Sequence, residues 1–447
     1  MRLRYDRTSV AHWLKGSLPR PFAQRLIADA FSRRLGRCIA HDELGFLPHP
    51  ASAIAVPGTP QGSVATIRAL SALCGEAMRQ RPLSQPHRGG GVPAPSWPGS
   101  PTAGHRPVDA APSEPHELAP VRTVLLHAAR SFEMFGGRHG RTALSTYAVH
   151  DVVPLLPLRG SARHRRTQTL TEVARLCFML ARLHMDSELH VLAKSFFACA
   201  QEFAVTAEDQ VTWALAVHGA SVQALHLRHT DFALRAAHTA VDVGVRAAGL
   251  SVQAVLLAQL TVPQAATGQH DEARSTLHAA ELACDVGADG CAEGPFAPYP
   301  AAALASDTAE VLYAAGDMRA AASALRDSLR LRAPHDHRGQ ALDHARLGQM
   351  LLRQRRLEEA AAEARLFTEL HRRLSSGFAD TAYDRLFGEF RTYGGRSVAI
   401  RTVLDLTMIR VRACGRACGC QDRAERAVPI NGELKGVAGS ASYCVRS

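Results

Sequence analysis

Residues 309–325 read AEVLYAAGDMRAAASAL, and this stretch carries the pattern of a helical hairpin. The pair Gly316-Asp317 is typical of a turn between two apolar segments. After that turn, Ala321 and Leu325 are four residues apart and therefore share one helix face. The small side chain of Ala321 permits a paired helix to approach closely. We therefore predict two short helices that pack against each other around this turn.

The same pattern recurs over residues 118–374. The anchor alanines are Ala193, Ala233, Ala273, Ala321 and Ala360, spaced by 40, 40, 48 and 39 residues. Four residues later come Phe197, Ala237, Leu277, Leu325 and Ala364, and three further on come Ala200, Ala240, Ala280, Ser328 and Phe367. Five residues before the anchors are predicted turns at Glu188, Arg228, Gly268, Gly316 and Arg355. Such a period predicts an α-solenoid of stacked helical hairpins, and a non-repetitive, alanine-rich helical bundle is the alternative.

Two of these units resemble the tetratricopeptide repeat. The matching residues are Ala309, Leu312, Gly316-Asp317 and Ala321 in one unit, and Leu347-Gly348, Leu351 and Ala360 in the other. The whole region resembles a degenerate tetratricopeptide array, which implies recognition of a protein or peptide, or self-association as a homodimer. Residues 132–158 are expected to form an irregular first unit anchored by Ala143 and Tyr147.

Residues 1–46 carry a second pattern, that of two amphipathic helices. Asp6 is suited to cap the first helix, and Val10, Trp13 and Leu14 lie on its apolar face. The other side presents hydrogen-bond donors of the kind that read base edges in a major groove, namely Arg7, Thr8, Ser9 and His12. A solvated basic face without DNA is the plainer interpretation.

The resemblance of this segment to a known family favours the DNA-binding interpretation. The string RYDRTSVAHWL from Arg4 to Leu14, followed by Gly16 and Pro19-Arg20, is similar to the recognition helix of actinobacterial Cro/repressor-type helix-turn-helix regulators with a C-terminal tetratricopeptide-like region. This resemblance implies sequence-specific binding of double-stranded DNA, with Lys15 and Arg20 contacting phosphates. The family's two helices before the recognition helix have no counterpart after Met1. We therefore expect that the true start lies upstream or that the domain is damaged.

Composition agrees with a DNA-binding protein. The 447 residues carry a formal net charge of +11, which favours acidic partners such as nucleic acid. Ten cysteines are sparse for this length, as in a reduced compartment. No apolar run is long enough to span a membrane, and the N-terminus does not resemble a signal peptide. The expected location is the cytoplasm, without membrane association.

The remaining segments are expected to be simpler. Residues 47–81 contain a short helix near 62–80, residues 82–117 form a Pro/Gly-rich disordered linker, and residues 414–447 form a disordered tail. Residues 375–413 are a candidate terminal cap, in which 397–411 fits a helix but is β-branched enough for a strand.

No constellation indicates catalysis or a cofactor. Cys414, Cys418, Cys420 and Cys444 do not have the spacing of a common zinc site, and His335-Asp336-His337 is interpreted as a solvated loop. We therefore predict an all-α protein with a partial helix-turn-helix module, a flexible linker and a tetratricopeptide-like α-solenoid. Its expected function is transcription regulation without enzyme activity or a metal. The alternative is an interaction scaffold with a vestigial DNA-binding fragment.

Overall fold

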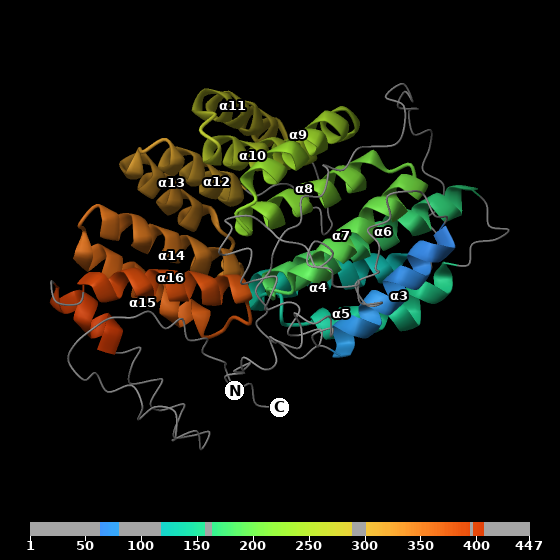
Figure 1. The fold of residues 1–447 in the computed structure, drawn as a ribbon, viewed down its shortest axis with the longest axis horizontal. Coiled ribbons are helices and arrows are strands. Elements are labelled where there is room, and N and C mark those ends of the chain that lie inside the picture. Colours follow the sequence, from blue (N-terminus) through green and yellow to red (C-terminus); the bar gives the residue numbers. More distant parts are fainter. Residues whose placement is uncertain (1–62, 80–117, 157–162, 288–300, 394–396, 406–447) are drawn as a thin grey trace, which may run out of the picture.

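The computed structural model describes residues 63–79, 118–156, 163–287, 301–393 and 397–405. Within these ranges every regular element is a helix, and no strand is present (Figure 1). The expected all-α class is therefore confirmed for the described part of the chain. None of the described helices combines the length and the apolar character needed to cross a bilayer.

Consecutive helices pack as hairpins across the region where the repeat was predicted. The pairs are α6 (Arg163–Asp186) with α7 (His190–Thr206), α8 (Gln210–His226) with α9 (Thr230–Ala247), α10 (Leu250–Ala266) with α11 (His270–Gly287), α12 (Ala301–Ala314) with α13 (Met318–Leu331), and α14 (His337–Arg353) with α15 (Leu357–His371). A short turn joins the two helices of each pair, so neighbouring segments of the sequence form the hairpin.

The predicted anchors and turns are confirmed. The anchor alanines are all fully buried, and the side chains four and seven residues after them are at most 8% exposed. The predicted turn residues all have positive φ, between 62° and 86°, and they are Glu188, Arg228, Gly268, Gly316 and Arg355. A residue in this left-handed conformation ends a helix and reverses the chain, which explains why turn and anchor recur together.

The irregular first unit differs from its prediction. Ala143 is exposed and Tyr147 is only half-buried, so neither is an anchor. Leu144 and Ala148 are buried in their place. Helix α5 (Arg141–Tyr147) is short and runs into the π-helical turn η1 (Ala148–Val152) and the 3-10 turn η2 (Val153–Leu155). The buried residues keep the predicted spacing of four but are displaced by one position, so the face that packs against the core was misassigned.

The short helix expected near 62–80 is α3 (Ser63–Arg79). It packs on α5 and α7, with Leu70 and Leu73 in the same apolar core as α6 and α7. Thr66 Oγ1 also donates a hydrogen bond to Glu202 at 2.6 Å. The helix that precedes the Pro/Gly-rich stretch is thus part of the main body, whereas the predicted linker itself lies outside the described residues.

At the other end of the array, α16 (Gly377–Tyr393) packs against α14 and α15. Residues 398–405 are helical, so the helix interpretation holds for this part of 397–411. Ile400 and Val403 are buried in the core formed by α12 to α16. This segment covers apolar surface of the last hairpin, as a terminal cap does. The predicted tail, 414–447, lies outside the described residues.

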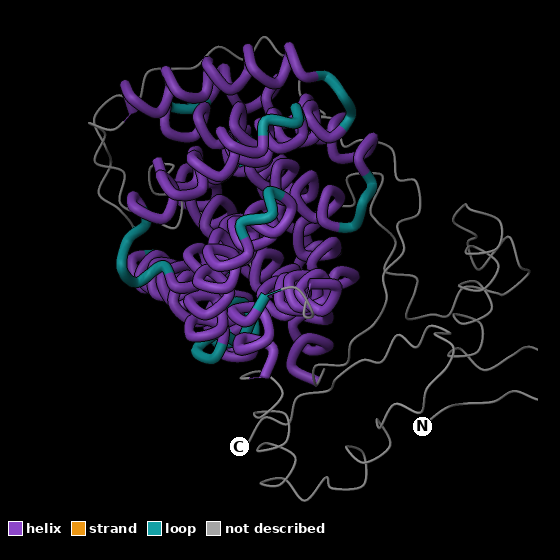
Figure 2. Tube along the Cα trace, turned by 90° about the vertical axis from the view of Figure 1, so that its left-hand side faces the viewer, coloured by secondary structure: helices purple, strands orange, loops and turns teal. Residues whose placement is uncertain are grey.

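The array bends until its two ends meet. Helices α6, α8, α10 and α12 pack in succession, and α13 packs against α14. Helix α4 (Ala119–Phe135) then contacts both α14 and α6. Figure 1 shows α4 between the first and last hairpins, and Figure 2 shows the same helical body from the side. We call the contact between the α4–α8 end and the α14–α16 end the closure junction.

Candidate functional site

The closure junction begins with backbone hydrogen bonds between distant segments. Helix α4 ends at Gly136, which has a φ of 85°. Directly after it, the Arg138 amide donates to the Ser375 carbonyl at 2.9 Å. In return, the Ser375 amide donates to the Phe135 carbonyl at 2.6 Å. The Arg138 side chain adds an ion pair with Asp380 at 2.5 Å, and these two residues are 242 positions apart.

Asp186, the last residue of α6, is at the centre of the junction and is fully buried. Its carboxylate accepts hydrogen bonds from the Gly137 amide at 2.6 Å, from Ser376 Oγ at 2.9 Å and from Arg338 Nε at 2.8 Å. These donors belong to the segment after α4, the start of α16 and the start of α14. A Cβ on Gly137 would lie 2.5 Å from the Leu183 carbonyl oxygen, so only glycine fits this approach.

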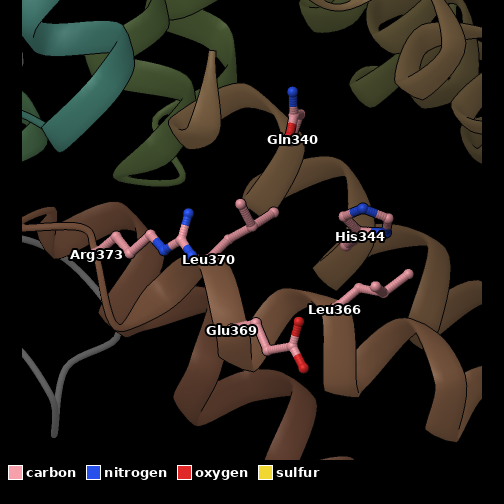
Figure 3. A pocket seen from close by; sticks show the side chains of 6 residues that line it. All are labelled: Gln340, His344, Leu366, Glu369, Leu370 and Arg373. Carbon is pink, nitrogen blue, oxygen red and sulfur yellow. The ribbon is translucent and has the colours of Figure 1, made fainter. Parts of the chain in front are cut away.

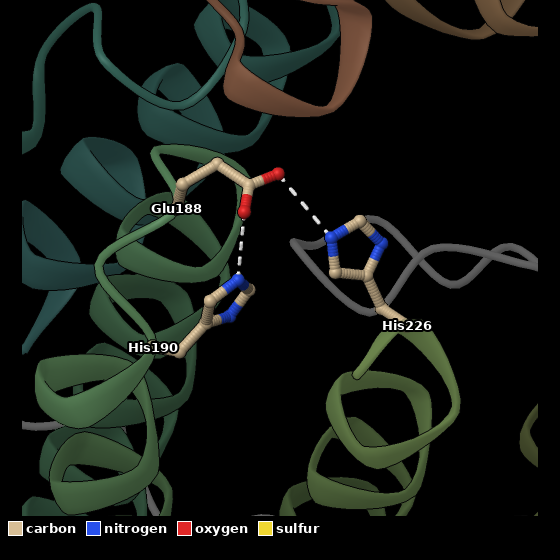
Figure 4. Close-up of side chains that lie close together, drawn as sticks. All are labelled: Glu188, His190 and His226. Carbon is tan, nitrogen blue, oxygen red and sulfur yellow. Dashed lines mark hydrogen bonds and ion pairs between the residues drawn. The ribbon is translucent and has the colours of Figure 1, made fainter. Parts of the chain in front are cut away.

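Glu188, in the α6–α7 turn, forms a second polar centre beside the first. Its carboxylate accepts from His190 Nε2 at 2.9 Å, His226 Nε2 at 3.2 Å and Thr381 Oγ1 at 3.2 Å (Figure 4). Burial acts to raise the pKa of Glu188, but the hydrogen bonds from the two histidines outweigh it and lower the pKa. The His226 ring stacks on Phe378 with centroids 3.9 Å apart. Glu188 is therefore ionised and cross-links the first two hairpins to α16.

Arg182, one turn before Asp186, differs from the other cations of the junction. Its guanidinium lies over Phe132 and Phe178, with centroid distances of 4.9 and 5.9 Å. Among the described residues it has no direct hydrogen-bond acceptor or ion pair, although the carboxylates of Glu133, Asp186 and Asp336 lie near enough to attract it. Burial and the nearby charge of Arg338 lower its pKa to about 10, so it stays charged at neutral pH. Burial and Arg182 also lower the pKa of His218 to about 4, so that this imidazole is neutral.

The sequence motif His335-Asp336-His337 is at the junction, but its side chains have separate roles. His335 Nε2 is 3.3 Å from a carboxylate oxygen of Glu133. Asp336 caps α14 by accepting from the Gly339 amide at 2.8 Å, and it also pairs with Arg332 at 2.6 Å. The expectation of a solvated loop is therefore wrong, because all three residues are half-buried and His337 begins α14.

The predicted DNA-contacting residues Arg7, Thr8, Ser9, His12, Lys15 and Arg20 lie outside the described residues, as do Cys414, Cys418, Cys420 and Cys444. Sequence reasoning identified Glu188 only as a turn and did not single out Asp186, Arg182, His190 or His226. A signal was present, however. Asp186 and His226 each lie seven residues before an anchor alanine, a register at which Ala266, Ala314 and Arg353 stand in the later repeats.

A shallow pocket lies away from the junction, between α14 and α15 (Figure 3). Its lining side chains are Gln340, His344, Leu366, Glu369, Leu370 and Arg373. His344 Nδ1 is already hydrogen-bonded to Glu363 at 2.6 Å. At about 200 Å³ the pocket is smaller than the usual range for small-molecule sites, roughly 300–1,000 Å³. The closure junction is therefore the stronger candidate site.

Comparison with known proteins adds one finding. A family model described as the SP15 N-terminal domain matches residues 1–47, a segment outside the described residues. No curated protein and no solved structure matches the chain.

Proposed function

We propose that this chain is a transcription regulator whose helical-hairpin array binds a protein or peptide and whose residues 1–46 bind double-stranded DNA. The repeat pattern and the stacked hairpins support a tetratricopeptide-like array. Stacked hairpins expose an extended surface that is suited to polypeptide ligands. The DNA-binding part rests on the residue pattern and the family resemblance of the N-terminal segment.

The proposal of partner binding rests mainly on the environment of the Arg182 guanidinium. Its planar fork is held over two aromatic rings, and among the described residues the carboxylates of Glu133, Asp186 and Asp336 attract it without a direct hydrogen bond or ion pair. Guanidinium and carboxylate groups form bidentate hydrogen bonds that are stronger than neutral ones. A half-buried arginine whose hydrogen-bond donors are not taken up by a described acceptor therefore fits an acidic side chain or the terminal carboxylate of a peptide.

Peptide selection on the full chain tests this part. We expect displayed random peptides selected on the wild-type chain to be enriched in acidic residues, and Arg182→Met to weaken the selected peptides at least tenfold, since a charge-assisted pair contributes about 1.5–3 kcal/mol. Arg319→Met is the matched control, because Arg319 is exposed on α13. Equal loss in both variants, or selected peptides without acidic residues, would contradict the role of Arg182.

DNA binding is tested by electrophoretic mobility shift on duplexes at several salt concentrations. Arg7→Ala should relax sequence preference, since a base contact contributes ~1–3 kcal/mol of discrimination. Lys15→Ala should weaken all duplexes alike and reduce the salt slope by about one. The alternative, an interaction scaffold with a vestigial N-terminal fragment, predicts no salt-dependent retardation for the wild-type chain.

A further inference from the structure

Two imidazoles and one carboxylate lie close together at the closure junction, and the proposed partner binding does not involve them. Glu188 contributes from the α6–α7 turn, His190 is the first residue of α7, and His226 is the last residue of α8. One candidate ligand atom from each lies within 4.8 Å of the others. Figure 4 shows the carboxylate between the two rings, with one oxygen directed at each Nε2. We propose that these three side chains bind a zinc ion.

The separations suit this ion after a small adjustment. Each Nε2 is already 2.9 or 3.2 Å from a Glu188 oxygen. In a tetrahedral zinc site with bonds of about 2.0–2.2 Å, neighbouring ligand atoms are roughly 3.3 Å apart. The two Nε2 atoms face different oxygens of Glu188, and the three ligand atoms lie within 4.8 Å of one another, so binding must draw them closer by up to about 1.5 Å toward a common point. A water molecule completes the fourth position.

The ligand types also favour zinc. Imidazole nitrogen with carboxylate oxygen is a common donor set for Zn²⁺, whereas Mg²⁺ and Ca²⁺ prefer oxygen ligands. Binding of the metal at Nε2 requires each neutral ring to carry its proton at Nδ1. The ionised Glu188 supplies one negative charge to the site and so offsets part of the charge of the ion.

The surroundings hold the three ligands in place. Thr381 Oγ1 hydrogen-bonds to the Glu188 carboxylate at 3.2 Å, and Phe378 stacks on the His226 ring. On the other side, Gln223 Nε2 donates to the His190 carbonyl at 2.7 Å. Partners of this kind orient metal ligands and raise affinity. Because Thr381 and Phe378 belong to α16, occupation of the site also strengthens the contact between the two ends of the array.

The test uses Zn²⁺ or Co²⁺ alone as the probe. The background is the full chain with Cys414, Cys418, Cys420 and Cys444 replaced by serine, which removes competing thiolates in the C-terminal tail. Isothermal titration with Zn²⁺ should show one tight site, and Co²⁺ should give the absorption of a tetrahedral nitrogen and oxygen site. The tight site should be absent from His226→Gln and from Glu188→Gln, and retained in His164→Gln, whose histidine is exposed at the start of α6.

Two further measurements keep the proposal falsifiable. Thr381→Val removes only the outer hydrogen bond and should weaken Zn²⁺ about 10–100-fold. Circular dichroism without metal should show that the glutamine variants are folded. The proposal is overturned if the wild-type background shows no tight site and no tetrahedral Co²⁺ spectrum. Retention of the site in the folded His226→Gln variant would equally place the ion elsewhere.

Discussion

Replacement of Asp186 by alanine is expected to lower the free energy of unfolding by about 3–5 kcal/mol, the cost of breaking a buried ion pair from one side. Asp186 is fully buried, and the side chain of Arg338, its ionic partner, is 17% exposed. Alanine leaves this guanidinium without its carboxylate. It also leaves the Gly137 amide and the Ser376 hydroxyl without their acceptor.

The same change should separate the ends of the array, because the donors to Asp186 come from the segments that meet there. Chemical denaturation measures the stability, and small-angle X-ray scattering measures the expected increase in the radius of gyration. Asp186→Asn is a milder variant that keeps an acceptor oxygen and loses the charge. We expect it to retain the compact form. Unchanged stability in Asp186→Ala would contradict the central role of this carboxylate.

The second large effect is expected at Asp343, a fully buried carboxylate in α14. It accepts from Ser306 Oγ at 2.9 Å, Ser328 Oγ at 2.7 Å and Arg332 Nε at 2.6 Å. It thereby connects α12, α13 and the segment after α13 to α14. Asp343→Ala should also lower the free energy of unfolding by about 3–5 kcal/mol, for the same reason.

Asp343→Ala is also the matched control for Asp186→Ala. The Asp343 network lies within the α12–α14 hairpins and does not join the two ends of the array. We therefore expect thermal or chemical denaturation to show a loss similar to that of Asp186→Ala, but scattering at low temperature to show no expansion. Equal expansion in both variants would indicate general loosening and not a specific junction.

The repeat was predictable from sequence because its causes are local. A left-handed turn residue, a small anchor five residues later and a bulky or small neighbour at i+4 are all set within about three helical turns. Gly316 and Ala321 show this in one unit, and Arg355 and Ala360 in another. The error at Ala143 is one of phase, because the buried pair Leu144 and Ala148 has the same spacing as the predicted pair Ala143 and Tyr147. Which face of this short helix is buried depends on the helices that pack on it, α3 and α6.

The closure junction was not predictable in this way. Arg138 and Asp380 are 242 positions apart, and no periodicity relates one to the other. The bend of the array depends on the sum of small rotations between hairpins, so the meeting of its ends is a property of the whole chain. The sequence held only a weak clue. Asp186 and His226 are polar at a register where two of the three later repeats carry alanine, and the last repeat carries Arg353.

Hydrogen exchange at the amides of Gly137, Arg138 and Ser375 tests the closure of the array most directly. None of the three is bonded within a helix, and their acceptors are the Asp186 carboxylate, the Ser375 carbonyl and the Phe135 carbonyl. Protection at these amides therefore requires the ends to be joined. We predict exchange much slower than in an open loop, and loss of that protection in Asp186→Ala. Exchange at the rate of an open loop in the wild-type chain would contradict the closed arrangement.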